Sequence, residues 1–484
     1  MKKHNSPRRP LLMINRHLIW ISALQLLVSF LLYEYSLERV LYINLLVFWA
    51  LLFLFAYNKR QNGSLLLGFL FTFFVFLLGR DFFCILGNEF YTTREVFSSA
   101  TVCKIYFLMH LSLTGIFWGW LISPPDIHTI GRPVSYNTRR QLLRKLKYVY
   151  YLTLPFQIFT LLVGAYYTLT YGYVTGNIVG EVYHPGAIIL RCSQFNFLVF
   201  CGYLMLAPEK KELKPILYIN TLVMTISVLG GSRGPFLYYL VMVFLYMYSR
   251  DCIETQIHTT QETSLFISKK MKITLMAISV PAIIFFNLYA AIRQHNQVES
   301  QGVVSDFIGF FMQQGGSHSV IGYTVDNINS FPSKNISYSF GSLVNRIQYG
   351  WTSSFDAKTE ELATKGNNLG ATITWIVAPG YYYAGGGMGT QYIAENYADF
   401  GAPGVLLLGV LLGMIISKLT FFAFSNWILQ TLLCYALPTV ISMPRDFYFT
   451  WTQSLMSVPN LLLLLLIYYS TKPQSERSGI VKGV

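Results

Sequence analysis

The sequence predicts an all-α integral membrane protein with about twelve transmembrane helices and one large late extracytoplasmic loop. Hydrophobic residues make up 53% of the 484 residues, 12% are charged, and the mean hydropathy is positive. Soluble domains carry about twice that share of charged residues, and a soluble core would leave much of this apolar surface exposed. Aromatic residues reach 16% of the chain, which excludes a disordered protein.

Twelve apolar runs account for the expected helices, because about 20 apolar residues are needed to cross the hydrocarbon core. The seventh, eighth and eleventh runs are short. No cleavage site for a signal peptide follows the first run. The runs are 17–33, 40–57, 64–86, 99–123, 148–170, 186–206, 215–231, 235–249, 273–292, 403–424, 426–442 and 453–470.

The distribution of Lys and Arg predicts the orientation. With the N-terminus in the cytoplasm and twelve crossings, two thirds of these residues fall on the inner side, as the positive-inside rule requires. Six lie within 125–147, but only five lie within the much longer segment 293–402. The expected organisation is nine helices in 1–292, an outer loop at 293–402, three helices in 403–470 and a cytoplasmic tail at 471–484.

Several classes of partner and cofactor are disfavoured. The net charge of +14 suits cytoplasmic loops beside anionic lipid, so a nucleic-acid partner is not expected. The six cysteines form no C-x-x-C pair or Cys/His cluster. No Walker A, Rossmann or H-E-x-x-H motif occurs in a usable context. We therefore expect no metal and no cofactor, and a substrate that arrives already activated.

Five arginines at the outer ends of the helices predict an anion site. Charges in membrane segments are costly and mark functional sites, and a guanidinium binds phosphate oxygens through two parallel hydrogen bonds. The structural alternatives are that the side chains extend to the lipid headgroups or form local ion pairs with Asp81 and Asp446. The candidate ligands of a lipid-linked diphosphate are Arg80, Arg191, Arg233, Arg293 and Arg445.

The end of the outer loop supplies candidates for acid–base chemistry. A helix expected from Thr390 places Glu395 and Asp399 on one face, four residues apart. His318, preceded by two glycines, is a third candidate for the general base, and the choice among the three stays open. Tyr392 and Tyr397 are the candidate sugar-stacking residues. A glycine-rich re-entrant turn with solvated acids is the competing interpretation.

These motifs resemble those of the Wzy-type polysaccharide polymerases. The resemblance is carried by Gly-Ser-Arg-Gly at 231–234, by the late outer loop, and by Tyr-Ile-Ala-Glu-Asn-Tyr-Ala-Asp-Phe-Gly at 392–401. It implies a GT-C-like multi-helix membrane glycosyltransferase in the bacterial inner membrane with its active site facing the periplasm. The implied substrates are undecaprenyl-diphosphate-linked oligosaccharides, which are joined into O-antigen or capsular polysaccharide, with a chain-length regulator as a possible partner.

The expected reaction is metal-independent. A hydroxyl of the acceptor repeat attacks the anomeric carbon of the donor, and lipid diphosphate leaves, stabilised by arginines. One alternative is an O-antigen ligase, which has the same chemistry but transfers glycan to a lipid core. A second alternative is a polysaccharide transporter or flippase, but the charges gather at the outer rim and the two halves differ, unlike most transporters.

The orientation can be tested with single cysteines at Ser330 and Ser264 in a background without native cysteines. We expect an impermeant thiol reagent added from outside to label Ser330→Cys and not Ser264→Cys, because 293–402 is placed outside and 250–272 inside by the charge distribution. The reverse pattern would overturn the orientation.

Overall fold

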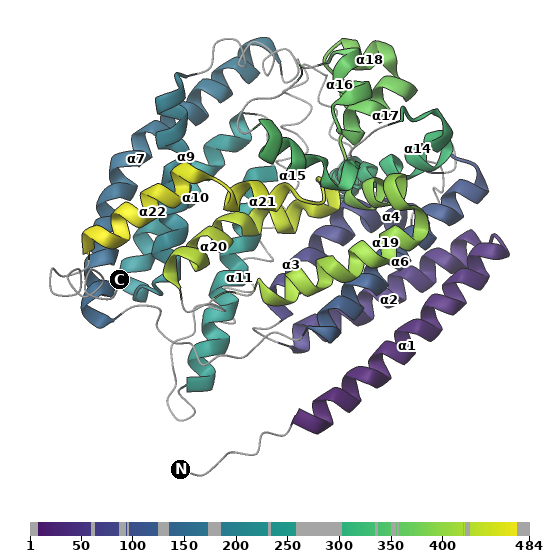
Figure 1. Cartoon of the computed structure of the whole chain (residues 1–484), viewed down its shortest axis with the longest axis horizontal. Coiled ribbons are helices and arrows are strands. Elements are labelled where there is room, and N and C mark those ends of the chain that lie inside the picture. Colours follow the sequence, from purple (N-terminus) through teal and green to yellow (C-terminus); the bar gives the residue numbers. More distant parts are fainter. Residues whose placement is uncertain are drawn as a thin grey trace. The chain divides into compact units, whose positions relative to one another are not determined.

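The computed structural model describes a helical protein and divides it into two compact units. The described residues are 8–59, 63–86, 93, 96–123, 135–172, 185–230, 234–257, 303–333, 337–349, 355, 358–419, 421 and 426–471, and they contain no strand (Figure 1). Unit 1 comprises Met1–Asp126, Phe311–Thr420 and Met443–Phe449. Unit 2 comprises Ile127–Phe310, Phe421–Ser442 and Thr450–Val484.

Among the described residues, nine helices are long and apolar enough to cross a membrane. They confirm the first seven predicted runs and the tenth and eleventh. They are α1 (Arg8–Glu34), α2 (Glu38–Asn58), α3–η2–α4 (Ser64–Leu86), α6 (Ser99–Ile122), α7 (Tyr136–Tyr171), α9 (Ala187–Met205), α10 (Lys210–Leu229), α19 (Tyr392–Lys418) and α20 with η5 (Trp427–Arg445).

The remaining three predicted runs differ from one another. The eighth forms helix α11 (Gly234–Ile257), which is not among the nine. The ninth, 273–292, lies outside the described residues. The twelfth is divided into α21 (Thr450–Leu455) and α22 (Val458–Thr471). Twelve spans, the GT-C-like fold and the predicted domain boundaries therefore stay predictions.

Unit 1 is built around the contact of α6 with α19 (Figure 1). Each helix carries a G-x-x-x-G motif, Gly115 with Gly119 on α6 and Gly409 with Gly413 on α19. A Cβ added at Gly409 would lie 3.0 Å from the carbonyl oxygen of Ser112, and one at Gly413 would collide with the backbone of Ile116. Small residues let membrane helices approach backbone to backbone, so these glycines hold α19 against α6.

Partly buried polar side chains link α1 to α6 and α2 to α1. The indole Nε1 of Trp118 on α6 donates a hydrogen bond to Ser22 Oγ on α1 at 2.7 Å. The amide of Asn44 on α2 donates to Ser29 Oγ on α1 at 2.6 Å. Much of the rest of α1 is exposed in the chain, as expected of a helix that faces lipid.

A π-helical turn interrupts the third span. It is η2 (Phe74–Leu78), between α3 (Ser64–Phe73) and α4 (Gly79–Leu86). Turns of this kind disturb the regular backbone ladder and occur frequently at functional sites. The hydroxyl of Tyr42 donates to the carbonyl of Leu78 at 2.7 Å. After Gly79 come Arg80 and Asp81, so the altered backbone lies one residue before the two charges predicted at the end of this helix.

The predicted outer loop is folded into short helices. They are α13 (Val303–Gln314), η3 (Gly315–His318), α14 (Ser319–Asn327), η4 (Ile328–Ser330), α15 (Tyr338–Tyr349), α16 (Glu360–Lys365), α17 (Leu369–Val377) and α18 (Pro379–Tyr383). Helix α19 starts at Tyr392, inside the segment expected to be loop, and is kinked at Gly401, where φ is +64°. The helix expected from Thr390 and the membrane run from 403 are thus two segments on either side of one glycine.

Unit 2 packs α9 between α7 and α20. Gly202 of α9 gives Trp427 room to approach, and the Trp427 indole donates to the Gly202 carbonyl at 3.0 Å. The side-chain amide of Asn196 donates to the Tyr150 carbonyl at 2.8 Å. Gly202 is therefore a packing residue between two helices.

Two basic residues of α7 bind the ends of other helices in unit 2. Arg139 donates through Nε to the Leu206 carbonyl and through Nη2 to the Ala207 carbonyl, at 2.8 and 2.6 Å, where α9 ends. Lys145 donates to the Ser470 carbonyl at 2.7 Å, near the end of α22. Cations at helix C-termini satisfy carbonyls that have no partner within the helix.

The glycine contact gives a stability prediction. We expect Gly413→Val to lower the amount of folded protein in membranes, because two added methyl groups and a Cβ meet the α6 backbone, at a cost of about 1–3 kcal/mol. Gly164→Val on α7 is the matched control, since a Cβ there meets no atom within 4 Å. Thermal unfolding of the two purified variants checks this, and equal midpoints would contradict the tight contact.

Candidate active site

Three short segments of unit 1, distant in sequence, meet around two of the predicted arginines. They are the start of α4, the 3-10 turn η3, and the 3-10 turn η5 (Met443–Arg445), which contacts α3 and η2. Gly315 of η3 lies against Arg80, because a Cβ at Gly315 would stand 2.9 Å from the Arg80 backbone nitrogen. Any larger residue at 315 would push the turn away from Arg80.

Arg445 reaches the same place from η5. Its Nη1 donates to the side-chain oxygen of Gln314 at 2.6 Å, and its guanidinium carbon lies 5.6 Å from the centre of the Phe76 ring. Stacking on an aromatic face leaves the other edge of a guanidinium free to donate. The side chain is exposed, so this edge is open to a ligand.

Arg80 approaches the same Gln314–Gly316 segment from α4. Its Nη1 is 3.7 Å from the position that a Cβ at Gly316 would occupy, so the guanidinium runs alongside the two glycines. The Nε atom is buried and has no hydrogen-bond partner among the described residues. A buried donor without a partner is costly, so this Nε retains donor capacity among the described contacts.

Asp81, the neighbour of Arg80 in the sequence, forms hydrogen bonds with residues of other segments. Its Oδ1 accepts a hydrogen bond from the Thr93 hydroxyl at 2.7 Å, and its Oδ2 accepts one from the Tyr106 hydroxyl at 3.0 Å. The same Oδ2 lies 3.9 Å from Nε2 of His318. Asp81 is 5% exposed, so its charge is balanced within the protein.

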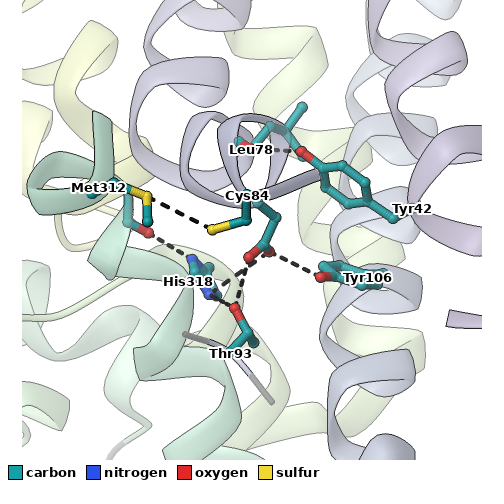
Figure 2. A network of polar contacts seen from close by, with 9 residues as sticks. Tyr42, Leu78, Cys84, Thr93, Tyr106, Met312 and His318 are labelled. Atoms are coloured by element: carbon teal, nitrogen blue, oxygen red, sulfur yellow. Dashed lines mark hydrogen bonds and ion pairs between the residues drawn. The ribbon is translucent and has the colours of Figure 1, made fainter. Parts of the chain in front are cut away.

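His318 is fully buried and contacts protein with both ring nitrogens (Figure 2). Nδ1 is 2.6 Å from the carbonyl oxygen of Gly315, and Nε2 is 3.0 Å from the hydroxyl of Thr93. The sequence prediction of a base at this position stays a prediction. The ring presents no nitrogen to solvent in this structure.

Glu395 is also fully buried. Its Oε1 accepts the Thr390 hydroxyl at 2.8 Å, and its Oε2 accepts the backbone N–H of Tyr448 at 2.9 Å. Tyr448 follows Arg445 by three residues, so Glu395 ties the first turn of α19 to the turn that carries this arginine.

Asp399 is only half-buried and caps α15. Its two oxygens accept the backbone N–H groups of Tyr338 and Ser339, at 2.8 and 2.7 Å, and a carboxylate at a helix N-terminus is favourable. The pKa of the Tyr338 phenol is raised to about 12. Burial is the main cause, the hydrogen bond to Thr372 opposes it, and the charge of Asp399 adds to it. Tyr338 therefore stays protonated at neutral pH.

The two candidate sugar-binding tyrosines have different surroundings. Tyr392 is fully buried, and its hydroxyl lies 2.6 Å from Ser112 Oγ at the contact of α19 with α6. Neither face of this ring is available to a sugar in the structure. Tyr397 is partly exposed, and Lys104 of α6 lies 5.1 Å from its ring centre. The stacking role stays a prediction for both.

The other three arginines are not brought to this place by the described residues. Arg191 belongs to unit 2, where its Nη1 donates to Gln194 at 2.9 Å. Arg233, in the Gly-Ser-Arg-Gly motif, and Arg293 lie outside the described residues. Within the described ranges no group of three or more His, Cys, Asp or Glu could hold a metal ion.

Sequence reasoning missed Gln314 and Thr93. Gln314 binds Arg445, and Thr93 stands between Asp81 and His318. The glycine pair 315–316 was noticed only as the context of His318, although glycines beside polar residues also indicate a close backbone approach. No local pattern marks Thr93, since its partners come from two distant segments.

Comparison with known proteins decides the family. A family model described as O-antigen polysaccharide polymerase Wzy matches residues 17–474, nearly the whole chain. The chain belongs to this family. Searches of curated proteins and of solved structures find no match.

Membership in the Wzy family confirms the predicted resemblance and the predicted function. The chain is a multi-pass membrane protein that polymerises O-antigen repeat units, and the family acts on lipid-linked oligosaccharide repeats. The ligase and transporter alternatives are thereby disfavoured. The family match covers both units and therefore does not itself select any residue of the site.

The arrangement of Arg80 and Arg445 gives a test of each side chain. We expect Arg80→Lys and Arg445→Lys to lower polymerisation at least about tenfold, since an ammonium keeps the charge but loses the planar fork of donors. Arg140→Lys, an exposed position on α7, is the matched control. The measurement is the polymerisation rate of purified lipid-linked repeats per folded molecule, and wild-type rates in both variants would exclude the two arginines from the site.

Proposed function

We propose that Arg80 and Arg445 bind the diphosphate of an undecaprenyl-diphosphate-linked oligosaccharide during O-antigen or capsule polymerisation. The observation that carries this is their approach to one segment, Gln314–Gly316, from two different elements. One guanidinium has an open edge, and the other has a buried Nε without a partner among the described residues. Two arginines that contact one segment suit a group with two phosphates.

Asp399 is the candidate base that the geometry supports best. Of the three candidates it alone is not fully buried. Two backbone N–H groups occupy part of its accepting capacity, but a carboxylate offers about four lone-pair sites. It is linked to the arginine-bearing turn, because Phe340, next to its partner Ser339, packs on Phe449 with ring centres 5.1 Å apart.

The proposed reaction is a single displacement. The acceptor hydroxyl forms a new C–O bond to the anomeric carbon as the bond from that carbon to the lipid diphosphate breaks. Asp399 takes the hydroxyl proton. Arg80 and Arg445 stabilise the negative charge that develops on the departing diphosphate. The donor bond is already activated and two guanidiniums meet the leaving group, so we propose that the reaction proceeds without a metal.

Glu395 then acts through Arg445 and not on the substrate. Its carboxylate holds the backbone of Tyr448 and the hydroxyl of Thr390. Both oxygens are used by neutral donors in a buried place, and removing either acceptor would leave a buried donor without a partner. We propose that Glu395 fixes the 443–449 turn.

The side of the membrane that we propose for the site is based on the distribution of Lys and Arg in the sequence. Arg80 and Arg445 fall at outer ends of helices in the orientation that Lys and Arg predict. We therefore propose that polymerisation takes place at the periplasmic face of the cytoplasmic membrane. A chain-length regulator as partner stays a prediction.

Two near-isosteric substitutions separate a base from a positioning carboxylate. We expect Asp399→Asn to lower the rate per folded molecule by about 10²–10⁴-fold and to leave repeat units unpolymerised. Glu395→Gln should mainly reduce the amount of folded protein, because its amide group would face a donor. Polymerisation assays normalised to folded protein test this. A near-normal rate in Asp399→Asn together with a lost rate in Glu395→Gln would instead identify Glu395 as the base.

A further inference from the structure

With Asp81 ionised, the hydrogen bonds around His318 determine which of its ring nitrogens donate (Figure 2). The Gly315 carbonyl, 2.6 Å from Nδ1, can only accept, so Nδ1 carries a proton. The Thr93 hydroxyl gives its single proton to Asp81. Nε2, 3.0 Å from that hydroxyl, must then donate to it. Both ring nitrogens are donors, which is the arrangement of an imidazolium.

Asp81 is the counter-ion of this cation. Its Oδ2 lies 3.9 Å from Nε2, and the two side chains are almost completely buried. A buried charge is tolerated only when it is paired and hydrogen-bonded. Asp81 meets that condition with hydrogen bonds from Thr93 and Tyr106, and His318 meets it with bonds to Thr93 and Gly315.

An imidazolium with both protons engaged has no lone pair to accept the proton of a sugar hydroxyl. What it does hold is the turn η3, through the Gly315 carbonyl. Gly315 lies against the backbone of Arg80, and the preceding residue, Gln314, accepts the hydrogen bond of Arg445. A shift of η3 would therefore move the surroundings of both arginines.

We propose that Asp81 and His318 form a buried ion pair, linked through Thr93, that positions the Gln314–Gly316 segment, which both diphosphate-binding arginines contact. Asp81 and His318 are positioning residues, not the base and its partner. The proposal rests on the proposed role of Arg80 and Arg445. It explains why a carboxylate adjacent to Arg80 in sequence binds a histidine more than 200 positions away in place of its neighbour.

The decisive comparison is between two substitutions of His318. His318→Gln keeps an amide that can donate but cannot act as a base, and His318→Phe keeps the ring shape but donates nothing. A positioning role predicts that kcat stays within about fivefold in each folded variant. KM rises about tenfold or more in His318→Phe and Asp81→Asn, and rises less in His318→Gln, which keeps a hydrogen-bond donor but loses the charge. A base would lose kcat equally in both His318 variants, with KM unchanged, and that result would overturn the proposal.

The binding readout uses farnesyl diphosphate as a competitor of polymerisation by the full-length protein in nanodiscs. We expect its inhibition constant to rise about tenfold in His318→Phe and Asp81→Asn and to rise less in His318→Gln, which keeps a donor but loses the charge. If Asp81→Asn or His318→Phe does not fold, Thr93→Val replaces them, and Thr93→Ser, which keeps the hydroxyl, is its matched control. An unchanged inhibition constant in Thr93→Val refutes the positioning role.

The same assay separates this proposal from the proposed function. If Arg80→Lys and Arg445→Lys do not change the inhibition constant, the diphosphate site itself is wrong, and the positioning proposal falls with it. If the arginine variants raise the constant but the Asp81, Thr93 and His318 variants do not, only the positioning proposal is overturned.

Discussion

The close approach of α6 and α19 is the contact on which the described part of unit 1 depends. Lipid tails are as apolar as the side chains of the helices, so burial of apolar surface does not drive helices together within a bilayer. Backbone contact across two pairs of glycines provides the packing instead. The first turns of α19 carry Glu395 and Asp399. Their position depends on how closely the later turns of α19, at Gly409 and Gly413, lie against α6.

The charged residues around the candidate site are of two kinds. Asp81, His318 and Glu395 are buried, and each is satisfied by hydrogen bonds of 3.0 Å or less. Arg80 and Arg445 stand at the border of the same region with donor capacity left over among the described contacts. In a medium of low polarity the first kind stabilises one geometry, and in the proposed function the second kind attracts an anion from outside. The buried carboxylates and the guanidiniums are thus parts of one arrangement with opposite tasks.

Hydropathy predicted nine of the twelve expected spans, because it depends on local composition. Seven consecutive runs and two late ones are helices of sufficient length. The G-x-x-x-G pairs at 115–119 and 409–413 were readable from sequence, but their mutual contact was not, since many helices could have supplied a partner. The i, i+4 spacing placed Glu395 and Asp399 correctly on one helix. It could not show that one would bind Tyr448 and the other the start of α15, because those partners are distant in the sequence.

The convergence of Arg80, His318 and Arg445 was beyond sequence reasoning for the same reason. Each residue was a candidate because of its own chemistry, but no local sequence pattern indicates that positions 80, 315 and 445 lie close together. Tyr392 shows the converse. An aromatic ring with a hydroxyl beside acidic residues is typical of a sugar site, but the rotation of α19 about its axis, fixed by the glycine contact, turns this ring into the core.

Helix α7 sets the depth of its neighbours in unit 2. Its 36 residues extend about 54 Å at the helical rise per residue, whereas the hydrocarbon layer is about 30 Å thick, so a charged section of the helix must extend beyond the lipid tails. Arg139 and Lys145, within this section, bind the ends of α9 and α22. The two helices are therefore attached to one charged level that cannot sink into the bilayer. A thicker or thinner membrane would have to be accommodated by tilting them together, which couples the inclination of this unit to the thickness of the lipid around it.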